Sequence, residues 1–359
     1  MQAPPPRELC ILRLSALGDV THVVPVVRTL QRHWPATRIT WIVGQAEQAL
    51  LAGLEGVEFV VVDKRRGPRA WCDLRRALAG RRFDVLFHMQ MALRASLYST
   101  AVRARIRVGF DRARAKDLQW LFTNRRISAV PRQHVLESFF EFPAALGLTR
   151  RELRWDIPIP EGDRAWAARI VTGPALVISP CSSFAYRNWL PDRYAAVARH
   201  AATRHGMQVV LSGGDSAIER EYARAIRAQA DVPVTDLVGR TTLKQVLALL
   251  ERATALVAPD SGPAHMATAV GTPVIGLYAC TNPDRARPYL SAQWTVNRYP
   301  EALRAEYGLS VEEAPWGRRV RAPHAMARIT VGEVTAVLDR LMSNGTPYSP
   351  GAGSSKQPA

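Results

Sequence analysis

Residues 9–35 read LCILRLSALGDVTHVVPVVRTLQRHWP, which predicts a strand, a short loop and a helix in succession. The apolar run at 9–14 suits a buried strand, the small residues at 15–19 suit a tight loop, and residues 20–34 have the apolar spacing of a helix. Pro35 then ends the helix. Repeated units of this kind form a parallel sheet with helices on both faces.

The same alternation extends outward from this stretch. Further strands are expected at 38–44, 57–63, 83–90 and 105–111, with helices at 45–53, 69–81 and 92–104. After the proline-rich segment WDIPIPEGD (155–163) the alternation restarts, with strands at 174–180, 207–214, 254–260 and 272–278 and helices at 190–206, 216–230, 243–253, 263–271 and 329–343.

This pattern predicts two doubly wound α/β domains. The expected division is a first domain at 1–155, a linker at 156–172, a second domain at 173–328, a terminal helix at 329–343 and a disordered tail at 344–359. Ligands of such domains bind beyond the carboxyl ends of the strands, and two facing domains would leave a cleft where two substrates can meet.

The composition narrows the class of protein. With 47% hydrophobic and 22% charged residues in 359, the chain is expected to fold around a sizeable core. Its four cysteines form no CxxC pair, which argues against a disulfide scaffold or a structural zinc site. No apolar stretch reaches the roughly 18–20 residues of a membrane span, and MQAPPPRELCILRL is no signal peptide. A cytoplasmic protein is expected.

The positive charge is concentrated in the first half of the chain. Of the formal net charge of +17, residues 1–160 carry +12 and residues 161–359 carry +5. A GC-rich coding bias can account for the preference for Arg over Lys. The uneven distribution points to an anionic partner of the first domain, either nucleic acid, acidic lipid or a phosphorylated substrate.

The junction APDSGPAHMATAVGTPVIGLY (258–278) has the features of a phosphate site. Asp260 ends a strand, Ser261 can cap the next helix, Gly262 allows close approach of a ligand, and His265 lies in the first helical turn. Free N–H groups at such a helix start attract phosphate. An ordinary capped helix has the same features.

Two other junctions carry polar side chains. In PCSSFAYRNWL (180–190), Ser182 and Ser183 offer hydroxyls and Arg187 can pair with phosphate, although a polar loop with a surface arginine is an alternative. In RLSALGDVTHVVP (13–25), Asp19 could act as a general base or cap the helix, and His22 could hold Asp19 or face solvent.

Two of these segments resemble signatures of one family. RLSALGDVTHVVPVVRTLQRHWP and DSGPAHMATAVGTPVIGLY are similar to the amino-terminal and D-[ST]-G-x-x-H signatures of the ADP-heptose:lipopolysaccharide heptosyltransferases of Gram-negative bacteria. The resemblance extends from about residue 9 to 283 and includes residues 109–126 and 133–139. It implies a GT-B fold and an inverting transfer of heptose from ADP-heptose to the inner core of lipopolysaccharide.

The resemblance also implies roles for individual residues. Asp19 matches the catalytic base, and Glu219 matches a carboxylate that binds the ribose, with Glu221 as its rival. The residues implied for the donor diphosphate and the nucleotide-sugar loop are Ser182, Ser183, Arg187, Asp260, Ser261, Gly262 and His265. Positive charge from Arg187 and the helix terminus could replace a metal, so metal-independent transfer without a cofactor is expected.

The acceptor is assigned to the first domain. Kdo carboxylates and lipid A phosphates would match its basic surface, whose candidate residues are Lys64, Arg65, Arg66, Gln90, Arg94, Arg112, Arg114, Arg125 and His134. Each of these could instead be a solvated surface residue, and His134 a helix-entry residue. A monomer is expected, with possible peripheral attachment to the inner membrane.

Several alternatives remain at this stage. A family member could use another nucleotide sugar or another acceptor, such as O-antigen or a protein. A nucleotide-sugar epimerase fits the motifs less well, and a nucleic-acid-binding protein would need a recognition motif that the sequence lacks. Residues 284–328 are longer and more irregular than the family pattern, and Cys181 and Cys280 are interpreted as core residues.

Overall fold

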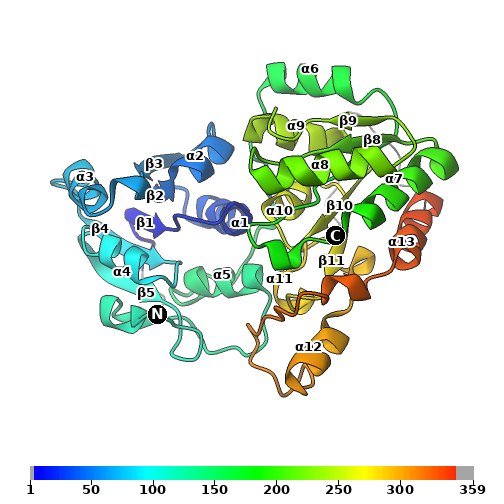
Figure 1. Cartoon of the computed structure of the whole chain (residues 1–359). Helices are drawn as coiled ribbons and strands as arrows, with labels where there is room; N and C mark the ends of the chain where they lie inside the picture. The colour runs from blue at the N-terminus through cyan, green and yellow to red at the C-terminus, as the bar shows by residue number, and fades with distance from the viewer. Residues whose placement is uncertain (1–3, 345–359) are drawn as a thin grey trace. The chain divides into compact units, whose positions relative to one another are not determined.

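The computed structural model describes residues 4–344, which divide into two compact units. Unit 1 runs to Pro158 and unit 2 begins at Ile159. Each unit contains one sheet of six parallel strands with helices between the strands, as the alternation in the sequence predicts (Figure 1).

In unit 1 the strand order is β3-β2-β1-β4-β5-β6. The strands are β1 (Glu8–Leu12), β2 (Arg38–Gly44), β3 (Val57–Val62), β4 (Phe83–His88), β5 (Ala104–Gly109) and β6 (Arg125–Arg126). The helices are α1 (Leu17–His33), α2 (Gln45–Leu51), α3 (Arg69–Ala77), α4 (Leu93–Ser99) and α5 (Val135–Ala144), with the 3₁₀ turns η1 (Lys64–Arg66) and η2 (Gln119–Phe122).

In unit 2 the strand order is β12-β11-β10-β7-β8-β9. The strands are β7 (Ala175–Ile178), β8 (Gln208–Leu211), β9 (Val234–Asp236), β10 (Ala255–Pro259), β11 (Val274–Tyr278) and β12 (Val296–Asn297). The helices are α6 (Glu161–Ile170), α7 (Pro191–His205), α8 (Ala217–Gln229), α9 (Leu243–Arg252), α10 (Gly262–Ala269), α11 (Pro283–Ala286), α12 (Tyr299–Tyr307) and α13 (Val331–Ser343), with the 3₁₀ turns η3 (Ala185–Arg187), η4 (Ala292–Trp294) and η5 (Met326–Arg328).

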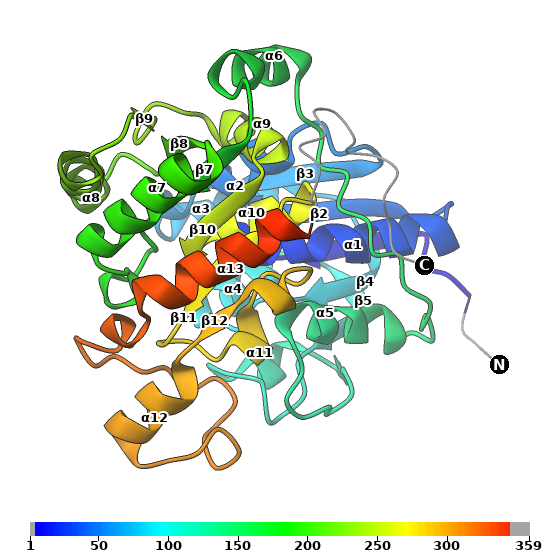
Figure 2. The same cartoon turned by 90° about the vertical axis from the view of Figure 1, so that its right-hand side faces the viewer.

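The central strands are buried on both faces. Leu9–Leu12 of β1 and Ala175–Ile178 of β7 are inaccessible to solvent, because helices cover both sides of each sheet. Helix α1 is itself almost wholly buried from Val20 to Leu30, and it packs against α5. In unit 2, Trp189 lies in the core, and helix α13 lies along α7 (Figures 1 and 2).

Both units share one topology, in which the first strand along the chain lies in the middle of the sheet and pairs with a strand on each side. β1 pairs with β2 and β4, and β7 pairs with β8 and β10. The strands on one side of β1 begin with β2 and those on the other side begin with β4, so the order of strands switches sides between β1 and β4. The same switch occurs between β7 and β10. Ligands of doubly wound sheets bind beyond the strand ends at such switch points, which directs attention to the segments that follow these four strands.

The less regular parts of the sequence contain structure that the pattern missed. Residues 156–172, predicted as a linker, include α6, which packs against α9. Residues 284–328 include most of α11, η4, β12, α12 and η5. The expected disorder of 344–359 falls, apart from Asn344, outside the described residues. Among residues 4–344, no helix is both long and apolar enough to cross a bilayer.

Candidate active site

The segments that follow β7 and β10 bring together the side chains predicted to bind the donor diphosphate. We call this place the β7/β10 edge; it comprises Cys181–Arg187 and Asp260–His265. Arg187 and Asp260 form an ion pair there, with 3.0 Å between Nη1 and Oδ2, and their side chains are only 10% and 14% exposed. Arg187 is therefore fixed beside the start of α10 rather than free on the surface.

The start of α10 offers unsatisfied donors. Ser261 occupies the N-cap position, but its hydroxyl makes no capping hydrogen bond. Its Oγ is buried and has no hydrogen-bond partner among the described residues. Pro263 lies in the first turn, where its missing N–H costs nothing, and the ring of His265 is 4.0 Å from Asp260. A buried hydroxyl beside an N-terminal helix dipole and an arginine is suited to an anion.

The loop after β7 is held by its own side chains. Asn188 Oδ1 accepts a hydrogen bond from the Ser182 backbone N–H at 2.8 Å, and the Ser182 hydroxyl bonds to the backbone of Phe184. Ser183 is exposed and its hydroxyl stays available. The two serines therefore differ: Ser182 shapes the loop, whereas Ser183 offers a donor to a ligand.

Aromatic rings and further arginines border this loop, and the sequence analysis did not identify them. The Phe184 ring lies 4.9 Å from the Arg187 guanidinium and 5.4 Å from that of Arg319. Arg321 lies 6.0 Å from the ring of Tyr186. Arg319 and Arg321 come from the irregular segment 284–328, so that segment adds positive charge to the β7/β10 edge. An isolated bridge between Thr281 and Arg319 holds it there.

Glu219 lies at the start of α8, beside the Gly213–Gly214 turn that follows β8. Its carboxylate accepts hydrogen bonds from the Gly214 backbone N–H at 2.6 Å and from the Ser216 hydroxyl at 2.5 Å. A capping box is also present: the Ser216 backbone N–H donates to the Glu219 carboxylate at 3.2 Å, and the Glu219 backbone N–H donates to the Ser216 hydroxyl at 3.3 Å. A Cβ on Gly214 would lie 3.0 Å from Glu219 Oε2, so the absence of a side chain allows this approach. Glu221 is exposed on α8 and makes no such contact with the turn.

Variants of the two capping-box residues can distinguish a role of Glu219 in capping α8 from a role in binding the donor. We expect Ser216→Ala to cost about 1 kcal/mol of unfolding free energy while leaving the KM for the nucleotide-sugar donor expected from the sequence unchanged. We expect Glu219→Ala to lower stability similarly and also to raise that KM about tenfold, because hydrogen bonds to a charged group are lost. Thermal unfolding and donor kinetics of both variants check this. Equal donor KM values for the two variants would assign Glu219 to capping alone.

In unit 1, Asp19 lies in the first turn of α1, beside the end of β1. Its carboxylate pairs with Arg13 and accepts a hydrogen bond from the Ala16 backbone N–H at 3.3 Å. The Arg13 guanidinium also donates to the Met89 carbonyl at 2.5 Å and lies 5.3 Å from the Phe139 ring. These contacts fix the position of the carboxylate, whose side chain remains 32% exposed. In the sequence, Arg13 lies within the apolar run 9–14, and no motif there marks it as a partner of Asp19.

His22 does not face solvent, which the sequence left open. It is 2% exposed, and its ring meets that of His134 edge-on, with 5.5 Å between ring centroids. His134 N-caps α5, since its Nδ1 accepts from the Leu136 backbone N–H at 3.1 Å. The position of His134 therefore matches the alternative given for it, a helix-entry residue.

Among the acceptor candidates, Gln90 contacts the segment that follows β1, and Lys64 lies beside Gly44 at the end of β2. Gln90 Oε1 accepts a hydrogen bond from the Leu14 backbone N–H at 2.7 Å. Burial lowers the pKa of Lys64, Glu47 opposes this shift, and the positive charges of Arg94 and Arg13 add to it. The charges of Arg94 and Arg13 therefore act on Lys64. We call the segments after β1 and β4 that hold Arg13, Asp19 and Gln90 the β1/β4 edge.

The remaining acceptor candidates are spread over other parts of unit 1. Arg65 pairs with Asp63, and Arg66 with Asp73, just after β3. Arg112 lies 5.9 Å from the Trp120 ring, and Arg125 is exposed on β6. Arg114 contacts Asp111, Ser128 and, at 2.6 Å, Gln133, so its guanidinium holds a loop together.

The two cysteines of unit 2 near the β7/β10 edge are buried, as expected for core residues. Burial raises the pKa of the Cys181 and Cys280 thiols to about 12, so neither is a thiolate near neutral pH. Among the described residues, neither edge contains three His, Cys, Asp or Glu side chains placed to share a metal ion.

Comparisons with known proteins agree with this arrangement. The model of glycosyltransferase family 9 (heptosyltransferase) matches residues 71–307. The lipopolysaccharide core heptosyltransferase OpsX of Haemophilus influenzae is 38% identical over 338 residues, covering 94% of this chain and 97% of OpsX.

Solved structures share the fold. A glycosyl transferase family 9 structure from Veillonella parvula superposes with a TM-score of 0.76 at 20% identity, covering 94% of this chain and 97% of that chain. The E. coli heptosyltransferase WaaC with ADP-2-deoxy-2-fluoro heptose gives 0.67 at 21%, covering 93% and 99%. The expected GT-B type of α/β fold is thereby confirmed.

Proposed function

Because the chain belongs to glycosyltransferase family 9 and is a glycosyltransferase, we propose that it transfers heptose from ADP-heptose to the Kdo/heptose inner core of lipopolysaccharide. The observation that carries the proposal is the anion-binding arrangement at the β7/β10 edge of a chain 38% identical to a lipopolysaccharide core heptosyltransferase. Incubation with ADP-heptose and defined acceptors tests it.

The donor diphosphate binds at the β7/β10 edge. Arg187 and the N-terminus of α10 supply positive charge, and the buried Ser261 hydroxyl donates to a phosphate oxygen. Glu219 accepts hydrogen bonds from the ribose hydroxyls. Arg319 and Arg321 add positive charge around the leaving ADP, so transfer proceeds without a metal cofactor. Turnover that is lost in EDTA and restored by magnesium would contradict this last point.

Asp19 acts as the base in an inverting transfer. It accepts the proton of the acceptor hydroxyl while that oxygen attacks the anomeric carbon and ADP leaves from the opposite face. Arg13 holds the carboxylate in position. The Asp19 proton later passes to solvent, so the enzyme returns to its starting state without a covalent sugar intermediate.

The acceptor binds to unit 1 through its basic residues. We expect the double variant Arg65→Glu/Arg66→Glu to raise the acceptor KM about tenfold while leaving the KM for ADP-heptose unchanged, because charge reversal repels an anionic glycolipid. Arg38→Glu is the matched control. Arg38 is 80% exposed, but it lies at the amino end of β2, whereas ligands of doubly wound sheets bind beyond the carboxyl ends of the strands. Steady-state kinetics with each substrate varied provide the measurement. Equal acceptor KM values in the double variant and the control would remove Arg65 and Arg66 from the acceptor site.

An exposed apolar surface on unit 1 supports peripheral attachment to the inner membrane from the cytoplasmic side. Five large apolar side chains of α4 and the adjoining η2 region are 40–60% exposed: Leu93, Leu97, Leu118, Trp120 and Leu121. Arg94 and Arg112 accompany them. Apolar side chains with basic neighbours are the features that bind an anionic bilayer surface.

This surface predicts binding to lipid vesicles. The protein is expected to float with vesicles that contain phosphatidylglycerol, and Leu97→Ser/Leu121→Ser is expected to lower the bound fraction at least about threefold, because less apolar area enters the interface. Leu290→Ser is a control, since Leu290 is similarly exposed but belongs to unit 2. Equal flotation of the double variant and the control would contradict the assignment.

A further inference from the structure

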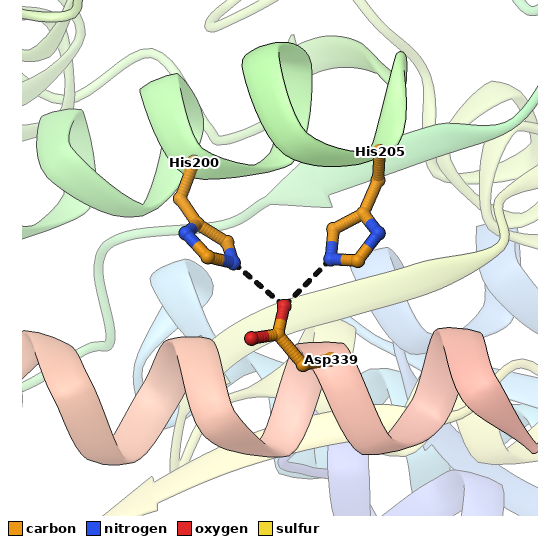
Figure 3. Close-up of side chains that lie close together, drawn as sticks. All are labelled: His200, His205 and Asp339. Atoms are coloured by element: carbon orange, nitrogen blue, oxygen red, sulfur yellow. Dashed lines mark hydrogen bonds and ion pairs between the residues drawn. The ribbon is translucent and has the colours of Figure 1, made fainter.

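His200, His205 and Asp339 form a cluster that the proposed transfer reaction does not use. The two histidines lie in the second half of α7, and Asp339 lies on α13, 139 and 134 residues further along the chain. Figure 3 shows the two imidazole rings pointing from α7 toward the carboxylate between them. Each ring Nε2 lies 2.6 Å from the same oxygen, Asp339 Oδ1.

The cluster is separate from the β7/β10 edge. The Cys181–Arg187 segment of that edge precedes Pro191, the first residue of α7, whereas His200 and His205 follow Pro191 by nine and fourteen residues. At a rise of about 1.5 Å per residue, the histidines lie roughly 13 and 21 Å along the helix axis from its start. A ligand of the cluster would therefore not contact the donor diphosphate.

The chemistry of the three side chains is that of a transition-metal site. Two imidazole nitrogens and one carboxylate oxygen are ligands that Zn²⁺ prefers, and all three atoms lie within 4.8 Å of one another. Burial acts to raise the pKa of Asp339, but the hydrogen bonds from His200 and His205 outweigh it and lower the pKa. The carboxylate is thus held as an anion at neutral pH.

The observed distances require only a small adjustment. With metal–ligand bonds of about 2.0–2.2 Å, two ligand atoms of a tetrahedral Zn²⁺ lie roughly 3.3 Å apart. Each nitrogen–oxygen pair at 2.6 Å would have to open by less than about 1 Å. The side chains are between 15% and 40% exposed, so they have room on the solvent side to rotate by this amount.

We propose that His200, His205 and Asp339 bind one Zn²⁺ ion, with solvent as the fourth ligand, and that the ion joins α13 to α7. Metal binding requires each Nε2 to lose its hydrogen. In a neutral ring the hydrogen moves to Nδ1, and in an imidazolium the Nε2 proton passes to solvent. Acid therefore weakens the site. The ion has a structural role and takes no part in sugar transfer.

The test uses the full chain without a polyhistidine tag, stripped with EDTA and titrated with Co²⁺ and then Zn²⁺. We expect one Co²⁺ per chain with visible absorption bands of a low-symmetry site, displacement of Co²⁺ by Zn²⁺, and a rise in the unfolding temperature with Zn²⁺. Asp339→Asn and His205→Gln are expected to weaken Zn²⁺ binding by at least about tenfold and to remove the temperature shift.

The controls separate a built site from loose binding by surface histidines. His324→Gln removes an exposed histidine of unit 2 outside the cluster and is expected to bind Zn²⁺ like the unmodified chain. Circular dichroism and sugar transfer in EDTA establish that each variant is folded. The proposal is overturned if the unmodified chain shows no saturable Co²⁺ band, or if folded Asp339→Asn binds Zn²⁺ as tightly as His324→Gln.

Discussion

Replacing Asp19 by asparagine is expected to lower kcat by about 100- to 10,000-fold, the range that a general base contributes. The amide keeps the size of the side chain and can still accept the hydrogen bond from the Ala16 backbone, but it cannot take a proton at neutral pH. The KM for ADP-heptose is expected to stay unchanged, because Asp19 belongs to unit 1 and the residues that we propose to bind the donor belong to unit 2.

Asp84→Asn is the matched control for this variant. Asp84 is also a carboxylate of unit 1, but it accepts hydrogen bonds from the backbone of Arg7 and Glu8 at the amino ends of β1 and β4. It should retain near-normal kcat. Thermal unfolding of both variants shows whether leaving Arg13 without its carboxylate disturbs the fold. A folded Asp19→Asn enzyme with normal kcat would show that another group takes the proton.

Replacing Arg187 by methionine is expected to lower kcat/KM for ADP-heptose by about 10- to 100-fold, since a hydrogen bond to a charged group is worth about 1.5–3 kcal/mol. The same change leaves Asp260 buried without its partner, which is expected to cost about 3 kcal/mol of unfolding free energy. Arg224→Met, on the exposed face of α8, should change neither quantity.

A second variant separates these two effects of Arg187. In Arg187→Met/Asp260→Asn the uncompensated charge is gone, so much of the lost stability should return. Donor kinetics should stay impaired, because the cation for the diphosphate is still missing. Recovery of kcat/KM together with stability would mean that Arg187 acts on the fold and does not bind the donor.

The order of strands and helices could be predicted from the sequence because both sheets are buried on both faces. Continuous apolar runs such as 9–14 and 174–180 leave little ambiguity, and the loops after them contain small and polar residues. The same reasoning selected Asp19, Arg187 and Asp260 as candidates, because they lie at or just after the ends of predicted strands. The structure places these segments after β1, β7 and β10.

Interactions between distant segments could not be predicted in this way. Arg13 lies in an apolar run, and only the fold brings it to Asp19 and Met89. Arg319 and Arg321 lie in a segment without periodic spacing, so nothing in the sequence places them beside Phe184 and Tyr186. The contact of His200 with Asp339 joins residues 139 apart and depends on the packing of α7 against α13.

The central claim is heptose transfer from ADP-heptose to the lipopolysaccharide inner core. Its most direct test incubates the purified chain with ADP-heptose and either Kdo₂-lipid A or an already heptosylated core, and records ADP release and product mass. One of the two acceptors is expected to gain a heptosyl residue with inverted anomeric configuration. Absence of transfer to both acceptors, with turnover of a different nucleotide sugar in a parallel panel, would contradict it.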